Sequence, residues 1–251
     1  MKFMKLDPYD YKSEAVALDF FNTLELPVNI QKTKWLSDDG KCIVLYGVQG
    51  TPLTKVKNLT LKQKKIISEK VGAFLKQIRK LEPDFAISDE TNRDNNGEAL
   101  IKSCQKNYEA NKAWLVKHFE KDIALLDKLL YEYFPAERKK LGDKLVFTHG
   151  DIWNPNVLID DSDNVAIIDF GGAGYYEEST DFGFEDDELR NMVLDSYGAG
   201  ETLRRKVELR HDMLYLATYQ AYISWLYGDE EAIKVCVPII RKIIEKYKTV
   251  L

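Results

Sequence analysis

The segment 148–170 carries four polar residues whose types and order suit phosphoryl transfer: His149, Asp151, Asn156 and Asp169. A carboxylate that takes a proton from an attacking hydroxyl must lie where substrate can reach it, which favours Asp151 as a general base or hydroxyl-positioning group. Mg²⁺ prefers oxygen ligands and keeps waters and substrate phosphates in its shell, so Asn156 and Asp169 suffice as its protein ligands. The segment therefore predicts a phosphoryl-transfer site.

Short strands are needed to bring these residues together. Asp151 follows the strand-like residues Leu145–Phe147, so we expect it in an accessible loop at the end of a strand. Asn156 begins and Asp169 ends a predicted β-hairpin, and the two ends of a hairpin lie close in space. Its predicted strands and polar link are Val157–Ile159, Val165–Ile168 and residues 160–164.

Elsewhere, hydrophobic periodicity and turn residues predict two strands near the N-terminus and helices over most of the remaining chain. The predicted strands are Phe3–Leu6 and residues 41–48, the second ended by Gly50-Thr51-Pro52. The predicted helices are Ser13–Leu24, Leu61–Leu81, one or two over Glu98–Tyr133 that close before Pro135, and several between Phe184 and Lys248, with a loop at 84–96. These elements predict an α+β fold.

Composition limits the class of protein. The 251 residues are 45% hydrophobic and 31% charged, with a formal net charge of −5, which argues against a general nucleic-acid-binding surface. The three cysteines are scattered without metal-ligand spacing, so neither a disulfide framework nor a zinc site is expected. The sequence shows no export signal and no apolar run near the roughly 20 residues that span a bilayer. We therefore expect a cytoplasmic protein without a membrane or nucleic-acid partner.

The pattern HxDxxxxN, followed by a hydrophobic strand and Ile-Asp-Phe-Gly, resembles the aminoglycoside phosphotransferase and choline kinase family. The resemblance covers most of the chain. It includes the helix at Ser13–Leu24, the strand at Ile43–Leu45 and the turn at Gly50–Leu53, which in such enzymes follows the hinge between lobes. Each half of the motif could arise by chance, but both at this spacing rarely do. The resemblance implies a protein-kinase-like fold with two lobes.

Carried over by position, the resemblance implies that Asp151 is the catalytic aspartate and that Asn156 and Asp169 bind the magnesium ions of a nucleoside triphosphate. It also implies that His149 organises the catalytic loop and that Asp181 is a structural aspartate of the site.

The resemblance further implies a site for ATP or GTP. The hinge positions whose backbone meets the purine edge fall at Tyr46 and Val48, and Ile168 would lie under the nucleotide. Lys5 falls where the phosphate-binding lysine of the third strand belongs, and Glu14 where its helix partner belongs. A lysine paired with a glutamate is held as a fixed positive charge against the phosphates.

The sequence departs from the family pattern in two regions. Only Met1 and Lys2 precede the strand that would be third in the family, so we expect a shortened N-terminal β lobe over residues 1–49 and a larger, mainly helical lobe over residues 50–251. Many relatives have an acidic residue where this chain has Gly171-Gly172, and Tyr176-Glu177-Glu178 replaces the usual Gly-Asp-Pro.

The implied acceptor is a small molecule with a hydroxyl group. The sequence from Glu177 to Glu188 is rich in carboxylates, which suits a solvated helix start or the rim of a site that attracts a cationic amino sugar or amino alcohol. Trp153, inside the catalytic loop, together with Glu177 and Glu178, are the candidate acceptor residues. The sequence does not indicate an oligomeric state.

Two other classes of protein remain. The first is a catalytically impaired nucleotide-binding or regulatory relative that has lost the hairpin covering the phosphates. The second is a protein kinase, which we rank last. The chain lacks a recognisable Ala-Pro-Glu element, and the roughly ten residues between Asp169 and Asp181 are too few for an activation segment.

Overall fold

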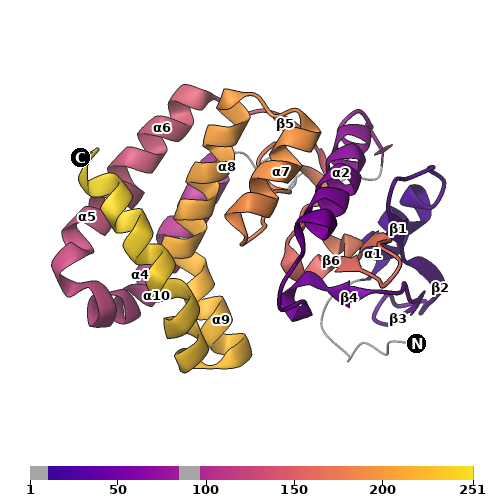
Figure 1. Ribbon diagram of the computed structural model, residues 1–251, viewed down its shortest axis with the longest axis horizontal. Coiled ribbons are helices and arrows are strands. Elements are labelled where there is room, and N and C mark those ends of the chain that lie inside the picture. The colour runs from indigo at the N-terminus through magenta and orange to yellow at the C-terminus, as the bar shows by residue number, and fades with distance from the viewer. Residues whose placement is uncertain (1–10, 85–96, 251) are drawn as a thin grey trace. The chain divides into compact units, whose positions relative to one another are not determined.

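The computed structural model describes residues 11–84 and 97–250, which divide into two compact units (Figure 1). The first unit comprises residues 1–93 and 145–201, and the second comprises residues 94–144 and 202–251. The strand predicted at Phe3–Leu6 and the loop predicted after residue 84 lie outside the described residues. The predicted lobe boundary after residue 49 is a different division of the chain and stays a prediction.

Three small sheets organise the described part of the first unit. One has four strands in the order β1-β7-β6-β4, with β1 parallel to β7 and the other neighbours antiparallel. The other two are antiparallel pairs, β2 with β3 and β5 with β8. The strands are β1 Asn29–Ile30, β2 Lys32–Leu36, β3 Ile43–Tyr46, β4 Thr51–Pro52, β5 Leu145–Thr148, β6 Val157–Ile159, β7 Val165–Ile167 and β8 Gly174–Glu177.

Three α-helices pack with these sheets. Helix α2 begins where the sequence predicts, because Thr60 and Gln63 form a capping box that satisfies backbone N–H groups at its first turn. Its buried face carries Ile67, Val71 and Phe74, at the three- and four-residue spacing of an amphipathic helix. The helices are α1 Lys12–Phe21, α2 Leu61–Ile78 and α7 Asp187–Tyr197, with 3₁₀ turns at Leu53–Lys55, Asn154–Asn156 and Phe170–Gly172.

Some predicted bounds are wrong. Helix α1 ends at Phe21 rather than Leu24, because the backbone N–H groups of Thr23 and Leu24 bond to carbonyls three residues back and tighten the last turn. The strand predicted at 41–48 covers only Ile43–Tyr46, where it pairs with β2.

The second unit is built from helices in the part of the chain that the structure describes. They are α4 Gly97–Phe119, a 3₁₀ turn Glu120–Asp122, α5 Ile123–Lys128, a π-helix Leu129–Tyr133, α6 Phe134–Leu141, α8 Glu201–Leu214, a π-helix Tyr215–Tyr219, α9 Gln220–Tyr227 and α10 Asp229–Lys248. Buried apolar side chains from these helices, including Tyr108, Leu115 and Ile240, form one core. No helix among the described residues is long and apolar enough to cross a membrane.

The prediction that the helices close before Pro135 is wrong. Pro135 is the second residue of α6, which directly continues the π-helix at Leu129–Tyr133, with helical dihedral angles at Tyr133 and Phe134. A proline inside a helix cannot donate to the carbonyl four residues back, and the π-helical turn that precedes it is where the hydrogen-bond register of the helix changes.

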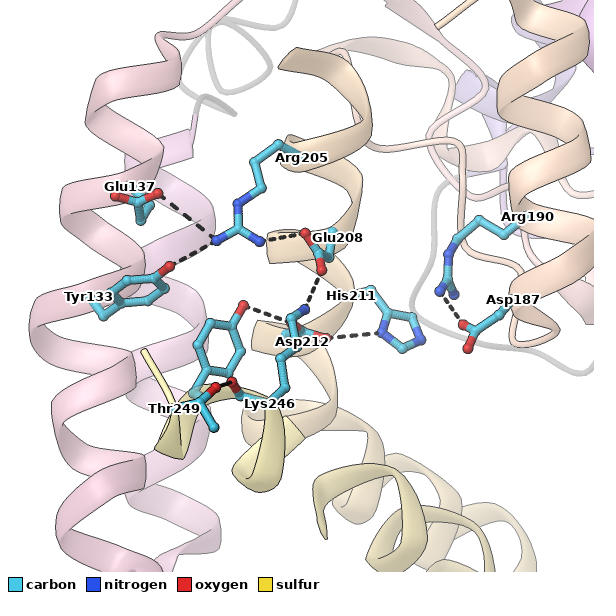
Figure 2. A network of polar contacts seen from close by, with 11 residues as sticks. Tyr133, Glu137, Asp187, Arg190, Arg205, Glu208, His211, Asp212, Lys246 and Thr249 are labelled. Carbon is cyan, nitrogen blue, oxygen red and sulfur yellow. Dashed lines mark hydrogen bonds and ion pairs between the residues drawn. The ribbon is translucent and has the colours of Figure 1, made fainter. Parts of the chain in front are cut away.

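A network of charged and phenolic side chains connects α8, α10 and α6 inside the second unit (Figure 2). Arg205 donates a hydrogen bond to the hydroxyl of Tyr133 at 2.9 Å and forms an ion pair with Glu208. The carboxylate of Asp212 accepts hydrogen bonds from Lys246 at 2.7 Å and from the hydroxyl of Tyr247 at 2.9 Å. These side chains therefore connect helices that are distant in sequence within the second unit.

Asp212 is the buried acid of this network, with 5% of its surface exposed. Burial alone would raise the pKa of Asp212, but hydrogen bonds from His211 and Lys246 and the charge of Lys246 outweigh it and hold the pKa below its ordinary value. The resulting stabilisation is present above the ordinary carboxyl pKa and is lost as pH falls through the lower folded-state value.

The first prediction concerns this carboxylate. We expect Asp212→Asn to lower the free energy of unfolding at pH 7 by roughly 2–4 kcal/mol, because the ammonium of Lys246 loses its buried partner. The difference from the parent protein should shrink as pH falls below about 4. Urea unfolding followed by circular dichroism measures both effects.

Glu132→Gln is the matched control, since Glu132 is exposed on the neighbouring π-helix. An equal loss of stability in both variants, or a difference that persists unchanged at low pH, would contradict the pairing described for Asp212.

Candidate active site

The loop after β5 turns sharply at Gly150. Its φ of +88° lies in the left-handed region, and a Cβ placed there would lie 2.0 Å from the carbonyl oxygen of Gly172. Only glycine fits both conditions. The backbone at Gly150, next to Asp151, therefore lies in close contact with Gly172, in the segment that follows Asp169.

Asp181 fixes the conformation of this loop. Its carboxylate is buried and accepts two backbone N–H groups, from His149 at 3.0 Å to Oδ2 and from Gly150 at 2.9 Å to Oδ1. Hydrogen bonds to an ionised carboxylate are stronger than neutral ones. The geometry is what the predicted structural role of Asp181 requires.

His149 supports the loop from the other side. Its ring is buried, and Nδ1 accepts the backbone N–H of Asp151 at 3.2 Å. Burial lowers the pKa of His149, so the neutral ring has its proton on Nε2. The ring also lies edge-on to Phe170, with 4.5 Å between centroids. These contacts suit the predicted organising role of His149.

Asn156 lies beside Asp151 and orients its carboxylate. The side-chain amide nitrogen donates to the backbone oxygen of Asp151 at 2.9 Å and to its Oδ2 at 2.7 Å. Both amide hydrogens are used in this way, which leaves Oδ1 of Asn156 as the atom able to ligate a metal ion. These two hydrogen bonds connect Asp151, the predicted base, to Asn156, a predicted metal ligand.

The β6–β7 hairpin brings Asp169 to the same place. Its strands pair from Val157↔Ile167 to Ile159↔Val165, and the backbone N–H of Ile168 donates to the carbonyl of Asn156 at 3.0 Å. Asp169 follows in the left-handed conformation, with φ 68° and ψ 70°, a strained position for a residue with a side chain. The sequence predicted this hairpin, with β7 one residue longer than observed.

The two predicted ligands fit a magnesium ion. The carboxylate of Asp169 is exposed and forms no hydrogen bond or ion pair with any described residue. The residue before it, Ile168, bonds through its backbone N–H to Asn156, whose Oδ1 is the second candidate oxygen. The described residues include no cluster of three or more His, Cys, Asp or Glu side chains that could enclose a metal. An ion held here would take its remaining ligands from water and phosphate, as Mg²⁺ commonly does.

Desolvation and the negative charges of Asp169 and Asp181 raise the pKa of Asp151 to about 6. The largest effect is desolvation, because protein atoms crowd the carboxyl group although the side chain reaches solvent, and the next is the negative charge of Asp169. The hydrogen bond from Asn156 acts in the opposite direction but is outweighed. Asp151 is thus tuned toward neutral pH, where a general base works best.

Helix α1 places Glu14 next to this segment. Phe21 of α1 packs on Phe170 with 4.8 Å between ring centroids, and Glu14 is buried, with its Cβ 4.0 Å from where a Cβ of Gly171 would lie. Lys5 lies outside the described residues, so the predicted Lys5–Glu14 pair stays a prediction.

The positions predicted to bind the nucleotide, Tyr46, Val48 and Ile168, stay predictions. Tyr46, at the end of β3, is 56% exposed, and Val48 and Ile168 are half-buried. Val48 also lines a cavity of about 480 Å³ whose wall includes Asp160 and Asn164. Those two residues lie at the hairpin turn, the end opposite Asn156 and Asp169, so this cavity is separate from the catalytic loop.

The candidate acceptor residues have different surroundings. Trp153 is half-buried and pairs with Gly183 in a parallel β-bridge, where a Cβ on Gly183 would lie 2.9 Å from the carbonyl of Ile152. Glu177 is 1% exposed and its carboxylate accepts the N–H and hydroxyl of Ser179, so its burial does not favour acceptor contact. Glu178 accepts a hydrogen bond from Tyr197 at 3.2 Å.

Glu185 is a residue that the sequence analysis did not single out. It follows the Gly183 contact by two residues, its side chain is exposed, and crowding by protein atoms raises the pKa of its carboxyl group. The sequence could not distinguish Glu185 from the other carboxylates of the acidic stretch. What distinguishes it is the contact of nearby Gly183 with the catalytic loop, which only the structure shows.

Comparison with known proteins identifies the class. Residues 10–209 match the model of the phosphotransferase enzyme family, so the chain belongs to that family. The α+β, protein-kinase-like fold expected from the sequence is confirmed by its similarity to solved phosphotransferase structures. A search of curated proteins finds no match to this sequence.

Three solved structures illustrate the similarity. The GDP and kanamycin complex of APH(2″)-IIIa has 20% identity and a TM-score of 0.63, covering 93% of this chain and 81% of that one. The ADP-bound aminoglycoside phosphotransferase APH(2″)-Ib has 18% identity and a TM-score of 0.59, covering 92% and 80%. Macrolide 2′-phosphotransferase MphH from Brachybacterium faecium, as apoenzyme, has 14% identity and a TM-score of 0.54, covering 90% and 77%.

The second prediction follows from the raised pKa of Asp151. Its folded-state value of about 6 lies above the ordinary 3.8, so its contribution to stability is largest below pH 4 and is lost as pH rises through 6. At pH 7 without metal, we expect Asp151→Asn to raise the free energy of unfolding by on the order of 1 kcal/mol, after discounting for solvent screening. Urea unfolding measures the change.

Asp161→Asn, in the exposed hairpin turn, is the control and should leave stability unchanged. A less stable Asp151→Asn variant at pH 7 would show that the carboxylate is not strained by its surroundings.

Proposed function

We propose that this protein transfers the γ-phosphoryl group of ATP or GTP to a hydroxyl of a small molecule in a magnesium-dependent reaction. The observation that carries the proposal is the hydrogen bond between Asn156 and Asp151 at the mouth of the β6–β7 hairpin, which also presents Asp169. One hairpin thus joins a carboxylate tuned for proton transfer to two oxygen ligands for a metal ion.

In the proposed reaction, the acceptor oxygen forms a bond to the γ-phosphorus as the bond to the β–γ bridging oxygen breaks. The hydroxyl proton passes to the carboxylate of Asp151, and a nucleoside diphosphate leaves. Bound Mg²⁺, held by Asn156 and Asp169, would supply positive charge to the phosphate oxygens. Most of the rate enhancement then comes from positioning and electrostatics.

The similar structures support the choice of nucleotide and acceptor. Their descriptions include complexes with GDP, ATP and ADP, and with kanamycin, gentamicin and streptomycin. In this chain, Glu185 makes no hydrogen bond or ion pair with the other described residues, and it follows by two residues Gly183, whose N–H bonds to Ile152 in the catalytic loop. An uncompensated carboxylate favours a cationic acceptor, so we propose an amino sugar or amino alcohol.

The third prediction tests the base. We expect Asp151→Ala to lower kcat by on the order of 10²-fold or more, because proton transfer and hydroxyl positioning are both lost. Nucleotide affinity measured by calorimetry with Mg²⁺ should stay within about threefold, since Asp151 is not assigned to nucleotide binding. Turnover is measured as nucleoside diphosphate release with a panel of amino sugars, amino alcohols and simple sugars.

Asp161→Ala serves as the control for loss of an exposed carboxylate. If the parent protein binds nucleotide and phosphorylates none of the acceptors, the non-catalytic alternative is favoured. If Asp151→Ala turns over as fast as the parent, the base has been assigned wrongly.

The fourth prediction tests the metal ligand without relying on activity. Asp169→Asn removes the negative oxygen ligand, so calorimetry should show at least a tenfold loss of nucleotide affinity in the presence of Mg²⁺, on the scale of losses for metal-site substitutions. Affinity measured with EDTA should be the same for the parent and the variant. An equal loss under both conditions would mean that Asp169 acts on the nucleotide or the fold and not through a metal ion.

A further inference from the structure

Arg79, just after α2, lies against two aromatic rings in the first unit. Its guanidinium carbon lies 5.0 Å from the ring centroid of Phe182 and 4.7 Å from that of Tyr197, and these two rings contact each other edge-on with 5.6 Å between centroids. A guanidinium is attracted to aromatic rings because its cation is planar and weakly hydrated. The two rings therefore limit where the guanidinium can lie.

A hydrogen bond sets the direction of this group. Nη2 of Arg79 donates to the backbone carbonyl of Glu178 at 2.7 Å, and the hydroxyl of Tyr197 donates to the Glu178 carboxylate at 3.2 Å. Nε and Nη1 of Arg79 are buried and have no hydrogen-bond partner among the described residues. A partly buried cation with only some of its donors satisfied contributes little net stability, and the bond that Arg79 does form is to the backbone at Glu178.

Close packing of α2 on α7 places Tyr197 over the guanidinium. The two helices lie side by side (Figure 1) and approach closely at Gly72. A Cβ on Gly72 would lie 2.7 Å from the Cβ of Ser196 and 2.9 Å from the backbone nitrogen of Tyr197. The position of the Tyr197 ring thus depends on the packing of two helices.

The segment that Arg79 holds leads directly to the catalytic loop. A turn closes between Glu177 and Thr180, whose N–H donates to the Glu177 carbonyl at 3.0 Å and whose hydroxyl donates at 2.7 Å. Asp181 comes next, and its carboxylate receives the N–H groups of His149 and Gly150. A shift of this turn would move Asp181 and loosen both bonds.

We propose that Arg79 is a positioning residue for phosphoryl transfer, acting through Glu178, Phe182 and Asp181 on the loop that carries Asp151. The proposal rests on the function proposed above. The strand before the turn is held by pairing of β8 with β5, from Leu145↔Glu177 to Thr148↔Gly174. Arg79 bonds to the turn itself, at the carbonyl of Glu178. Asp181 is thereby fixed between two anchors.

The test compares Arg79→Met and the milder Arg79→Lys with Lys80→Met, which removes an exposed cation at the adjacent position. We expect Arg79→Met to lower kcat about tenfold with KM for nucleotide and acceptor within twofold of the parent. Arg79→Lys should recover part of kcat, since an ammonium can still reach the Glu178 carbonyl but cannot stack as a plane. Lys80→Met should behave as the parent.

A second measurement needs no activity. Amide hydrogen exchange by NMR should show at least tenfold faster exchange at His149 and Gly150 in Arg79→Met, with protection in β6, β7 and the second unit unchanged. Absence of phosphoryl transfer by the parent protein would refute the proposed function, and the exchange data would still decide whether Arg79 controls the loop.

Two results would overturn the proposal. One is unchanged exchange at His149 and Gly150 in both Arg79 variants. The other is a rise in exchange spread evenly over the first unit, with kcat falling only as the folded fraction falls, which would make Arg79 a general stability residue. If Arg79→Met does not fold, Arg79→Lys decides by the same two measurements.

Discussion

The candidate site depends on one interaction: the buried carboxylate of Asp181 accepts the adjacent backbone N–H groups of His149 and Gly150. A loop that ends a strand and turns at a left-handed glycine has few internal hydrogen bonds, and its N–H groups need an outside acceptor. Asp181 supplies it, and His149 then accepts the N–H of Asp151 from within the loop. The position of the proposed base is therefore set by its backbone, which leaves its carboxylate available to substrate.

The same geometry works against stability at Asp151. Desolvation and the charge of Asp169 both favour the protonated carboxyl group, while Asn156 can donate only to one of its oxygens. A site that minimised the free energy of the folded state would separate these two carboxylates or give each a cation. Their proximity makes sense if a cation and phosphates share the site during the reaction, because a metal ion inverts the local preference for protonation.

Much of the site could be predicted because it lies in one short stretch of sequence. A β-hairpin of two short apolar strands with a polar turn is a local feature. That Asn156 and Asp169 lie at the same end of this hairpin therefore follows from residues 156–169 alone. Other features depend on contacts between segments that lie up to 99 residues apart in sequence. They are the contacts of Arg79, the contact of Gly183 with the catalytic loop and the burial of Glu177. Those depend on how helices and sheets pack, which a periodic pattern does not encode. Pro135 misled the prediction because a proline that ends a helix and a proline that follows a π-helical turn within one have the same local sequence.

The glycines after Asp169 show how a departure from the family pattern can be accommodated. Gly150 needs to be glycine, yet a Cβ at Gly171 or Gly172 would meet its nearest neighbour at 3.6 or 3.5 Å, an ordinary contact. Sterics therefore do not explain the absence of the acidic residue that many relatives carry there. Its electrostatic consequence is clearer, because another carboxylate in this segment would add to the negative charge of Asp169 and raise the pKa of Asp151 further. With glycine at both positions, Asp169 is the one acidic side chain of the segment 169–172, and Asp151 keeps a pKa from which it can be deprotonated at neutral pH.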